Sequence, residues 1–216
     1  MTTETARKTA HELFVDGLSQ LAAAANSTNR QSSGIARARL ARLRRGFAGD
    51  RYVSDALAVV YAYDPPPGEE ELWLLVGALF ATHPRHRRGM GNLGAAYGQL
   101  LRAHGGRAGA AERRFTQLVA VEGDALRHYL RQAVQLLASF EVPLDYYRLL
   151  LDLRVLLSDG SSIKDAEIRQ RVRLAWLKDF HRTQTSSSAE PRRAQNAPGE
   201  LAETTEDAAT NDVLDA

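Results

Sequence analysis

The chain has 216 residues, of which 44% are hydrophobic and 25% charged, a composition typical of an ordinary globular protein. It has no cysteine, which excludes disulfides and thiolate metal sites. Its longest apolar stretch, residues 72–81, is too short for a membrane-spanning helix, which needs about 20 residues. Charge is unevenly distributed: residues 1–182 carry 26 Lys and Arg against 19 Asp and Glu, whereas residues 183–216 carry 2 against 7.

Apolar residues recur at helical spacing along most of the chain. The first half predicts helices over residues 10–25 and about 35–45, one capped by Asp50 or Ser54 that runs to about Tyr63, and one from Glu69 to near Thr82. The second half predicts helices over about 92–103, 110–121, 123–138, 143–157 and 163–182. Between them, the polar residues 26–34, the prolines of 64–68 and the basic residues 83–94 predict loops.

The predicted fold class is all-α, because no segment shows the two-residue alternation and β-branched enrichment of a strand. We expect a bundle of about eight or nine helices within residues 1–182, with a division into two packed sub-bundles near residue 105 left open. Residues 183–216 are acidic and poor in large apolar side chains. Such a segment cannot bury enough surface to offset its ordering entropy, so we expect a disordered tail.

The strongest functional signal is an arginine cluster in the helix expected at about 35–45. Its members are Arg37, Arg39, Arg42, Arg44 and Arg45. No acidic residue lies among them, so their mutual repulsion is costly unless something negative lies opposite. A phosphate backbone meets that demand, because guanidinium groups donate paired hydrogen bonds to it. The alternative is a solvated helix face whose arginines pair with distant carboxylates.

A second cluster, Arg85, Arg87 and Arg88, lies in the predicted loop 83–94, where Gly89 and Gly91 permit close approach to a backbone. The neighbouring histidines, His83 and His86, have only basic neighbours, which would repel a cation. We therefore expect no metal site.

Two further groups of arginines are weaker candidates for phosphate contact. Arg113 and Arg114 lie at the start of a predicted helix, where Glu112 is adjacent and arginine stems could simply cover apolar surface. Arg169, Arg171 and Arg173 lie on the last predicted helix, where Asp165 and Glu167 could pair with them locally. For both groups a purely structural role remains open.

Known catalytic signatures are missing from the sequence. It contains no P-loop, no GxSxG elbow, no HExxH and no CxxC. The segment GMGNLG does not follow a predicted strand, as a dinucleotide-binding loop would. We therefore expect neither an enzyme nor a cofactor. The N-terminus lacks the apolar region of a secretory signal, so we expect a cytoplasmic protein without membrane contact.

Six segments, in order, carry a family resemblance across roughly residues 10–182. They are ARLARLRRG, GNLGAAYGQL, AAERRFTQLV, LRHYLRQAVQLL, VPLDYYRLLLDL and RVRLAWLKDF. Together they resemble the CasB family, the small subunit of the type I-E CRISPR Cascade complex. The chain departs from the family pattern in its longer tail after Thr183 and in Ala95, where an arginine would be expected.

The resemblance implies a helical subunit present as two head-to-tail copies that touch the large subunit and the backbone subunits of Cascade. Such a subunit helps to hold the guide RNA–target DNA hybrid and the displaced strand, which stabilises the R-loop. Base pairing supplies the sequence specificity, so contacts to the nucleic-acid backbone suffice. Matching the family's basic surface points first to Arg44 and Arg45, then to Arg113, Arg114 and Arg169 or Arg171.

Two other functions remain open. A free-standing helical DNA-binding regulator or nucleoid protein would need base-reading side chains such as Asn or Gln among its arginines, and residues 35–45 offer none. A pure scaffold would direct its arginines at acidic protein surfaces instead.

Overall fold

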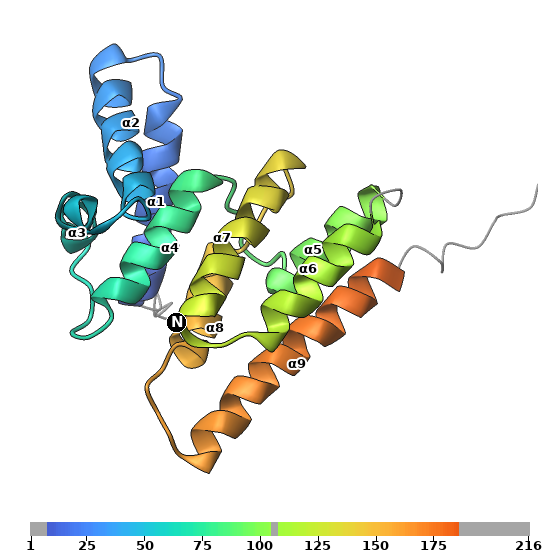
Figure 1. Cartoon of the computed structure of the whole chain (residues 1–216). Coiled ribbons are helices and arrows are strands. Elements are labelled where there is room, and N and C mark those ends of the chain that lie inside the picture. Colours follow the sequence, from blue (N-terminus) through green and yellow to red (C-terminus); the bar gives the residue numbers. More distant parts are fainter. Residues whose placement is uncertain (1–7, 105–107, 186–216) are drawn as a thin grey trace, which may run out of the picture.

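The computed structural model describes residues 8–104 and 108–185 (Figure 1). Within these ranges it contains nine α-helices and no strand, which confirms the predicted all-α fold. The helices are α1 (Ala10–Ala25), α2 (Arg30–Arg45), α3 (Val53–Tyr61), α4 (Glu70–Thr82), α5 (Leu93–Ala103), α6 (Ala108–Ala120), α7 (Gly123–Ser139), α8 (Tyr146–Leu156) and α9 (Ile163–Thr185). A short 3-10 turn, Asp50–Tyr52, precedes α3.

Several helix ends differ from the sequence-based expectation. The N-cap of α3 is Tyr52, without a side-chain capping bond, rather than Asp50 or Ser54, and the helix ends at Tyr61 rather than at about Tyr63. Helix α2 begins at Arg30 rather than near 35, because the Asn29 side chain accepts hydrogen bonds from the backbone N–H groups of Gln31 and Ser32. Helix α8 begins at Tyr146 rather than at Pro143, because Asp145 caps it. Helix α9 continues to Thr185, three residues into the predicted tail.

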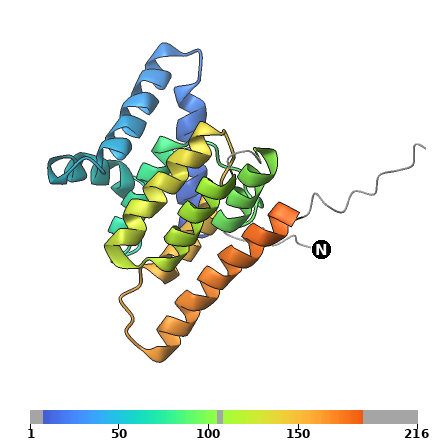
Figure 2. The same ribbon diagram turned by 45° about the vertical axis from the view of Figure 1, so that its right-hand side comes forward.

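The first four helices form one side of the molecule, in which α2 packs against α1, α3 and α4. Helices α5, α6 and α9 form the other side, and in both views α9 runs alongside α5 and α6 (Figures 1 and 2). Helices α4, α7 and α8 meet between them. The predicted division near residue 105 and the predicted disorder of residues 186–216 concern segments outside the described ranges, so both stay predictions.

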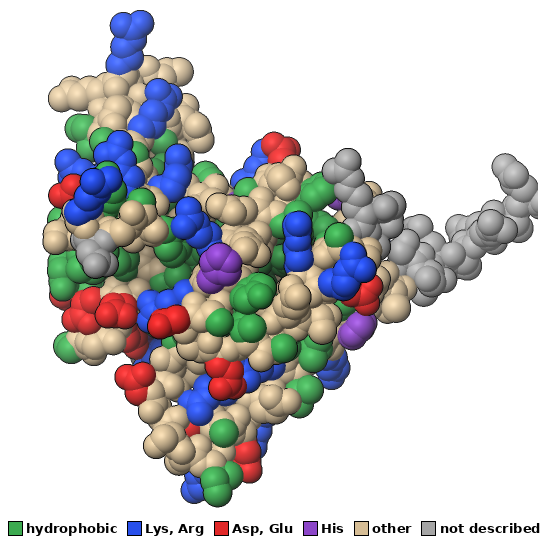
Figure 3. Space-filling model, viewed as in Figure 1, with side chains coloured by type: hydrophobic (Ala, Val, Ile, Leu, Met, Phe, Trp, Pro, Cys, Tyr) green, Lys and Arg blue, Asp and Glu red, His purple; other side chains and the backbone are tan. Residues whose placement is uncertain are grey.

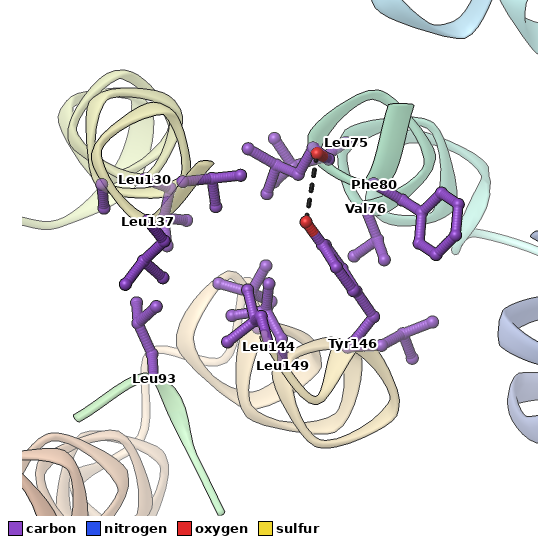
Figure 4. Close-up of a cluster of buried hydrophobic side chains, with 14 of the residues drawn as sticks. Leu75, Val76, Phe80, Leu93, Leu130, Leu137, Leu144, Tyr146 and Leu149 are labelled. Atoms are coloured by element: carbon purple, nitrogen blue, oxygen red, sulfur yellow. Dashed lines mark hydrogen bonds between the residues drawn. The ribbon is translucent and has the colours of Figure 1, made fainter. Parts of the chain in front are cut away.

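Apolar side chains from α4, α7 and α8 meet in the centre of the core (Figure 4). Leu75 of α4 points toward Leu130 of α7, whereas Val76 and Phe80 of α4 lie on the side of Tyr146, whose ring centre is 5.0 Å from that of Phe80. Tyr146, the first residue of α8, is fully buried among them, and its hydroxyl donates to the carbonyl oxygens of Leu79 and His83 at 3.3 and 2.8 Å. A buried hydroxyl without partners is costly, so these bonds fix α8 against the end of α4.

Helices α5 and α9 touch backbone to backbone. A Cβ at Gly94 would lie 1.8 Å from the carbonyl oxygen of Trp176, and one at Gly98 would lie 2.6 Å from that of Phe180. Only glycine permits this approach. The Trp176 indole N–H donates to the buried carboxylate of Asp152 on α8 at 2.7 Å. Helix α9 is therefore fixed to both α5 and α8.

Candidate nucleic-acid interface

Helix α2 turns a narrow apolar stripe inward and its arginines outward. Ala36, Leu40 and Leu43 are buried against the neighbouring helices, as the spacing predicts. All five predicted arginines of this helix are exposed. Their surroundings nevertheless divide them into two groups.

Arg37 and Arg44, on one flank of α2, bind the ends of neighbouring helices. The Arg37 Nε donates to the carbonyl oxygen of Ala25, the last residue of α1, at 2.9 Å. The Arg44 Nε and Nη2 donate to the carbonyl oxygen of Ala81, near the end of α4, at 3.1 and 2.9 Å. Carbonyl groups at a helix C-terminus lack intrahelical donors and carry partial negative charge, so arginine is well matched to them. These two arginines position α2.

Arg39, Arg42 and Arg45 form the other group. None has a hydrogen-bond or ion-pair partner among the residues whose side chains the structure describes, namely 8–49, 51–104 and 109–185. Arg39 lies toward Tyr63: burial raises the pKa of that phenol, and the charge of Arg39 opposes the rise. Arg42 and Arg45 are left as exposed cations at the end of the helix.

Arg131 of α7 continues this positive surface and was missed at the sequence level. Its guanidinium carbon lies 5.3 Å from the ring centre of Phe47, two residues beyond Arg45. Both residues line a hollow between the end of α2, α4 and α7, together with His128. The sequence did hold a signal for Arg131, because its spacing from His128 and Gln135 places all three on the exposed side of α7. A single arginine in a helix turn, however, did not stand out as a cluster.

Arg114 extends the surface onto α6. It lines a second hollow with Gln132 and Gln135, which neighbour Arg131 on α7. Neither Arg114 nor the adjacent Arg113 has an ion-pair partner among the described residues. We call Arg42, Arg45, Arg131 and Arg114 the basic band. Figure 3 shows Lys and Arg side chains spread over the face formed by α2, α7 and α6.

The arginines of the loop between α4 and α5 lie elsewhere, on the side of α1 and α8. Arg85 pairs with Glu141 at 2.8 Å. Arg88 pairs with Glu12 of α1, and its guanidinium carbon lies 4.7 Å from the ring centre of Tyr147. The hydrogen bond from Arg88 lowers the pKa of Glu12 to about 2. Of the three predicted loop arginines, only Arg87 has no side-chain partner among the described residues.

The two histidines of this loop have structural roles. His83 is buried with a ring nitrogen 2.7 Å from the carbonyl oxygen of Val142, and burial lowers its pKa. The Nδ1 of His86 accepts a hydrogen bond from the backbone N–H of Tyr146 at 3.1 Å. In the part of the chain that the structure describes, no three His, Asp or Glu side chains gather as a metal site would require.

The three predicted arginines of α9 all have partners within the chain. Arg169 donates to the carbonyl oxygens of Ser158 and Gly160 at 3.3 and 2.7 Å, which fixes the loop before α9. Arg173 pairs with Glu122 at 2.6 Å and lowers the pKa of that carboxyl. Arg171 lies 3.8 Å from Glu167, one turn earlier. They do not join the basic band.

None of the helices in the described ranges combines the length and the apolar character that crossing a membrane requires.

Comparison with known proteins gives consistent results at the levels of family and fold. The family model of CRISPR-associated protein Cse2 matches residues 39–181. The crystal structure of CasB from Thermobifida fusca is 29% identical, with a TM-score of 0.56 over 78% of this chain and 98% of that one. CasB from M. ruber is 25% identical, with a TM-score of 0.59 over 86% and 99%.

A chain of a solved CRISPR RNA-guided surveillance complex has the same fold, with a TM-score of 0.63, 24% identity, and coverage of 83% of this chain and 95% of that one. No curated protein matches the chain. Because the family model covers well over half of the residues, the chain belongs to the Cse2 family of CRISPR-associated proteins, also called CasB.

Proposed function

We propose that this chain is a non-catalytic subunit of a CRISPR RNA-guided surveillance complex, in which its basic band holds nucleic-acid backbone and so stabilises the R-loop. The observation that carries this proposal is the band itself. Arg42, Arg45, Arg131 and Arg114 come from three different helices, and none pairs with a carboxylate among the side chains that the structure describes, which do not include that of Asp50.

The arrangement suits a long polyanion better than a small ligand. Arg131 and Arg114 line two separate hollows, and Phe47, two residues beyond Arg45, contacts Arg131, so the band extends over several helices rather than lining one pocket. Exposed glutamines, Gln132 and Gln135, lie between them and can donate to phosphate or sugar oxygens. Contacts of this kind position a backbone and carry little sequence information, as an RNA-guided complex needs.

A modest number of such contacts can matter. Exchange of a DNA duplex for an RNA–DNA hybrid is close to balanced in free energy, so backbone contacts to the hybrid or to the displaced strand shift the equilibrium. We propose that the guide RNA–target DNA hybrid and the displaced strand are the ligands, and that the large subunit, the backbone subunits and a second, head-to-tail copy of this chain are the partners. The shared fold with a chain of a surveillance complex supports this membership.

The structure favours a different set of contact residues from the one that the sequence ranked first. Arg44 is engaged with Ala81, and Arg85, Arg88 and Arg173 are engaged with carboxylates. We therefore propose Arg42, Arg45, Arg114 and Arg131 as the principal backbone contacts. Arg39, Arg87 and Arg113 can add to them.

A charge-matched mutation series tests the contact residues. The variant R42Q/R45Q/R131Q removes three positive charges from the band, and the control R85Q/R88Q/R171Q removes three positive charges elsewhere. Affinity of the assembled complex for target DNA is measured against salt concentration. The band variant should bind more weakly for every guide sequence and flatten the slope of log affinity by about 0.7–0.9 for each lost phosphate contact.

Two results would contradict the proposal. One is an equal loss in both variants, which would mean that net charge alone matters. The other is a loss confined to some target sequences, which would indicate base reading and favour a sequence-specific DNA-binding regulator. Membership of the complex is tested separately: the tagged chain should co-purify with a short processed RNA and several other proteins.

A further inference from the structure

The C-terminal segment of the chain has the charge to occupy the basic band. Residues 186–216 contain seven acidic residues against two arginines. The acids are Glu190, Glu200, Glu203, Glu206, Asp207, Asp212 and Asp215. Four of them fall within residues 200–207, so the negative charge is concentrated in one part of the segment.

The first residues of this segment follow directly after α9, whose C-terminal end lies near the α6 part of the band. Helix α9 packs against α6 through Phe180 and Phe115, whose stacked ring centres are 4.6 Å apart. Arg114 precedes Phe115, and α9 ends at Thr185, five residues beyond Phe180 and thus about 7.5 Å further along the helix. The segment therefore starts near the α6 end of the band.

Its length is sufficient for the whole band. Thirty-one residues follow Thr185, and at no more than about 3.6 Å per residue they reach up to about 110 Å. That distance exceeds the diameter of a domain of this size. Because both groups belong to one chain, the effective concentration of the acids at the band is on the order of millimolar, without any partner.

We propose that residues 186–216 bind the basic band in the free chain and are displaced when nucleic acid binds. The acids take the place that phosphates occupy later, because carboxylates and phosphates both accept hydrogen bonds from guanidinium groups. The consequence is competition: weak, promiscuous binding to cellular RNA and DNA is suppressed, whereas a ligand with many phosphates in register displaces the segment. This inference rests on the proposed function for the identity of the competitor, but docking of the segment can be measured without nucleic acid.

Energy transfer within the full-length chain measures docking directly. Since the sequence has no cysteine, Q117C on α6 and A216C at the C-terminus give two unique labelling sites. At about 50 mM salt, transfer should be higher with the native segment than with one carrying E190Q, E200Q, E203Q, E206Q, D207N, D212N and D215N. The difference should vanish near 500 mM salt, where charges are screened beyond about 4–5 Å. A control pair, S161C with A216C, labels the loop before α9 and should not show the increase.

Binding of the same unlabelled proteins to a thymidine oligonucleotide of about 30 nucleotides measures the competition. The neutralised variant should bind about tenfold more tightly at about 50 mM salt, with a steeper salt dependence, and the two proteins should converge near 500 mM. A variant with the same residues of the segment in permuted order should behave like the native chain, because the effect depends on charge.

The outcomes separate the two proposals. Equal energy transfer for native and neutralised segments at low salt overturns docking, even if DNA affinity differs, because repulsion at a distance would explain the affinity. Docking without measurable DNA binding by either protein supports this inference and counts against backbone contact by the isolated subunit. DNA binding of equal strength with no change in energy transfer leaves the proposed function standing and removes this inference.

Discussion

The Trp176 indole N–H of α9 donates to the Asp152 carboxylate of α8 at 2.7 Å, and both side chains are buried. Asp152 also lies 3.1 Å from the Arg148 Nε on its own helix. Burial raises the pKa of Asp152, against the opposing effects of Trp176 and Arg148. The carboxylate therefore serves as a hydrogen-bond acceptor at the cost of carrying a charge inside the core.

The first prediction concerns Asp152→Asn. Asn keeps an acceptor for the indole and removes the ionisation. Because the pKa of Asp152 is raised in the folded state, ionisation of this carboxyl disfavours folding. As pH falls through that raised pKa toward 3.8, the wild type should therefore gain stability relative to the variant. Urea unfolding of both proteins between about pH 4 and 7 measures the difference. A difference that stays constant with pH would show that Asp152 titrates as it does in the unfolded chain.

The second prediction concerns Gly94→Ala. Its Cβ would lie 1.8 Å from the Trp176 carbonyl oxygen, so α9 must shift away from α5. We expect a loss of about 3 kcal/mol or more in the free energy of unfolding. Gly109→Ala on α6 is the matched control, because nothing lies within 4 Å of its Cβ, and it should be neutral or stabilising by up to about 1 kcal/mol. Similar losses in both variants would contradict the backbone contact.

The third prediction separates two adjacent arginines. Arg44→Ala removes two hydrogen bonds to the Ala81 carbonyl oxygen and should lower the free energy of unfolding by about 1–2 kcal/mol. Arg45→Ala removes an exposed side chain and should change stability by less than about 0.5 kcal/mol. Arg45→Ala should instead lower the salt slope of nucleic-acid binding by about 0.7–0.9. A loss of stability in Arg45→Ala together with a lower salt slope in Arg44→Ala would refute the division of roles on α2.

The fourth prediction concerns Arg173→Met, which keeps an apolar stem. The variant loses the 2.6 Å pair with Glu122 and the bond to the Val121 carbonyl oxygen. It should lose about 1 kcal/mol of stability while the salt slope of nucleic-acid binding stays at the wild-type value. A flatter slope would place Arg173 among the phosphate contacts after all.

Much of the fold could be predicted because local signals agree with the tertiary structure. The apolar stripe Ala36, Leu40 and Leu43 is buried as its spacing predicts, and the prolines of 64–68 do separate α3 from α4. The start of α2 was misplaced because serines and a glycine in residues 30–34 have low helix propensity, while the Asn29 cap and tertiary packing stabilise the turn.

The candidate site was only partly predictable, because pairing depends on contacts distant in sequence. Arg88 meets Glu12 across 76 positions, and Arg85 meets Glu141 across 56. No local pattern distinguishes these arginines from Arg87. Arg131 was missed for the converse reason: its neighbours in the basic band come from α2 and α6, and only the fold brings them onto one face.

The exposed arginines of α2 and the arginine that binds the end of α4 should differ in how well they tolerate substitution by lysine. A lysine at position 42 or 45 still presents a positive charge to a phosphate, so such an exchange preserves most of the attraction. At position 44 it does not suffice, because two donors on a planar fork share the Ala81 oxygen and an ammonium group cannot reproduce that geometry. Exchange of arginine for lysine along this one helix would thus weaken nucleic-acid binding modestly at positions 42 and 45, where the charge stays but the paired hydrogen bonds are lost, and would destabilise the fold at position 44.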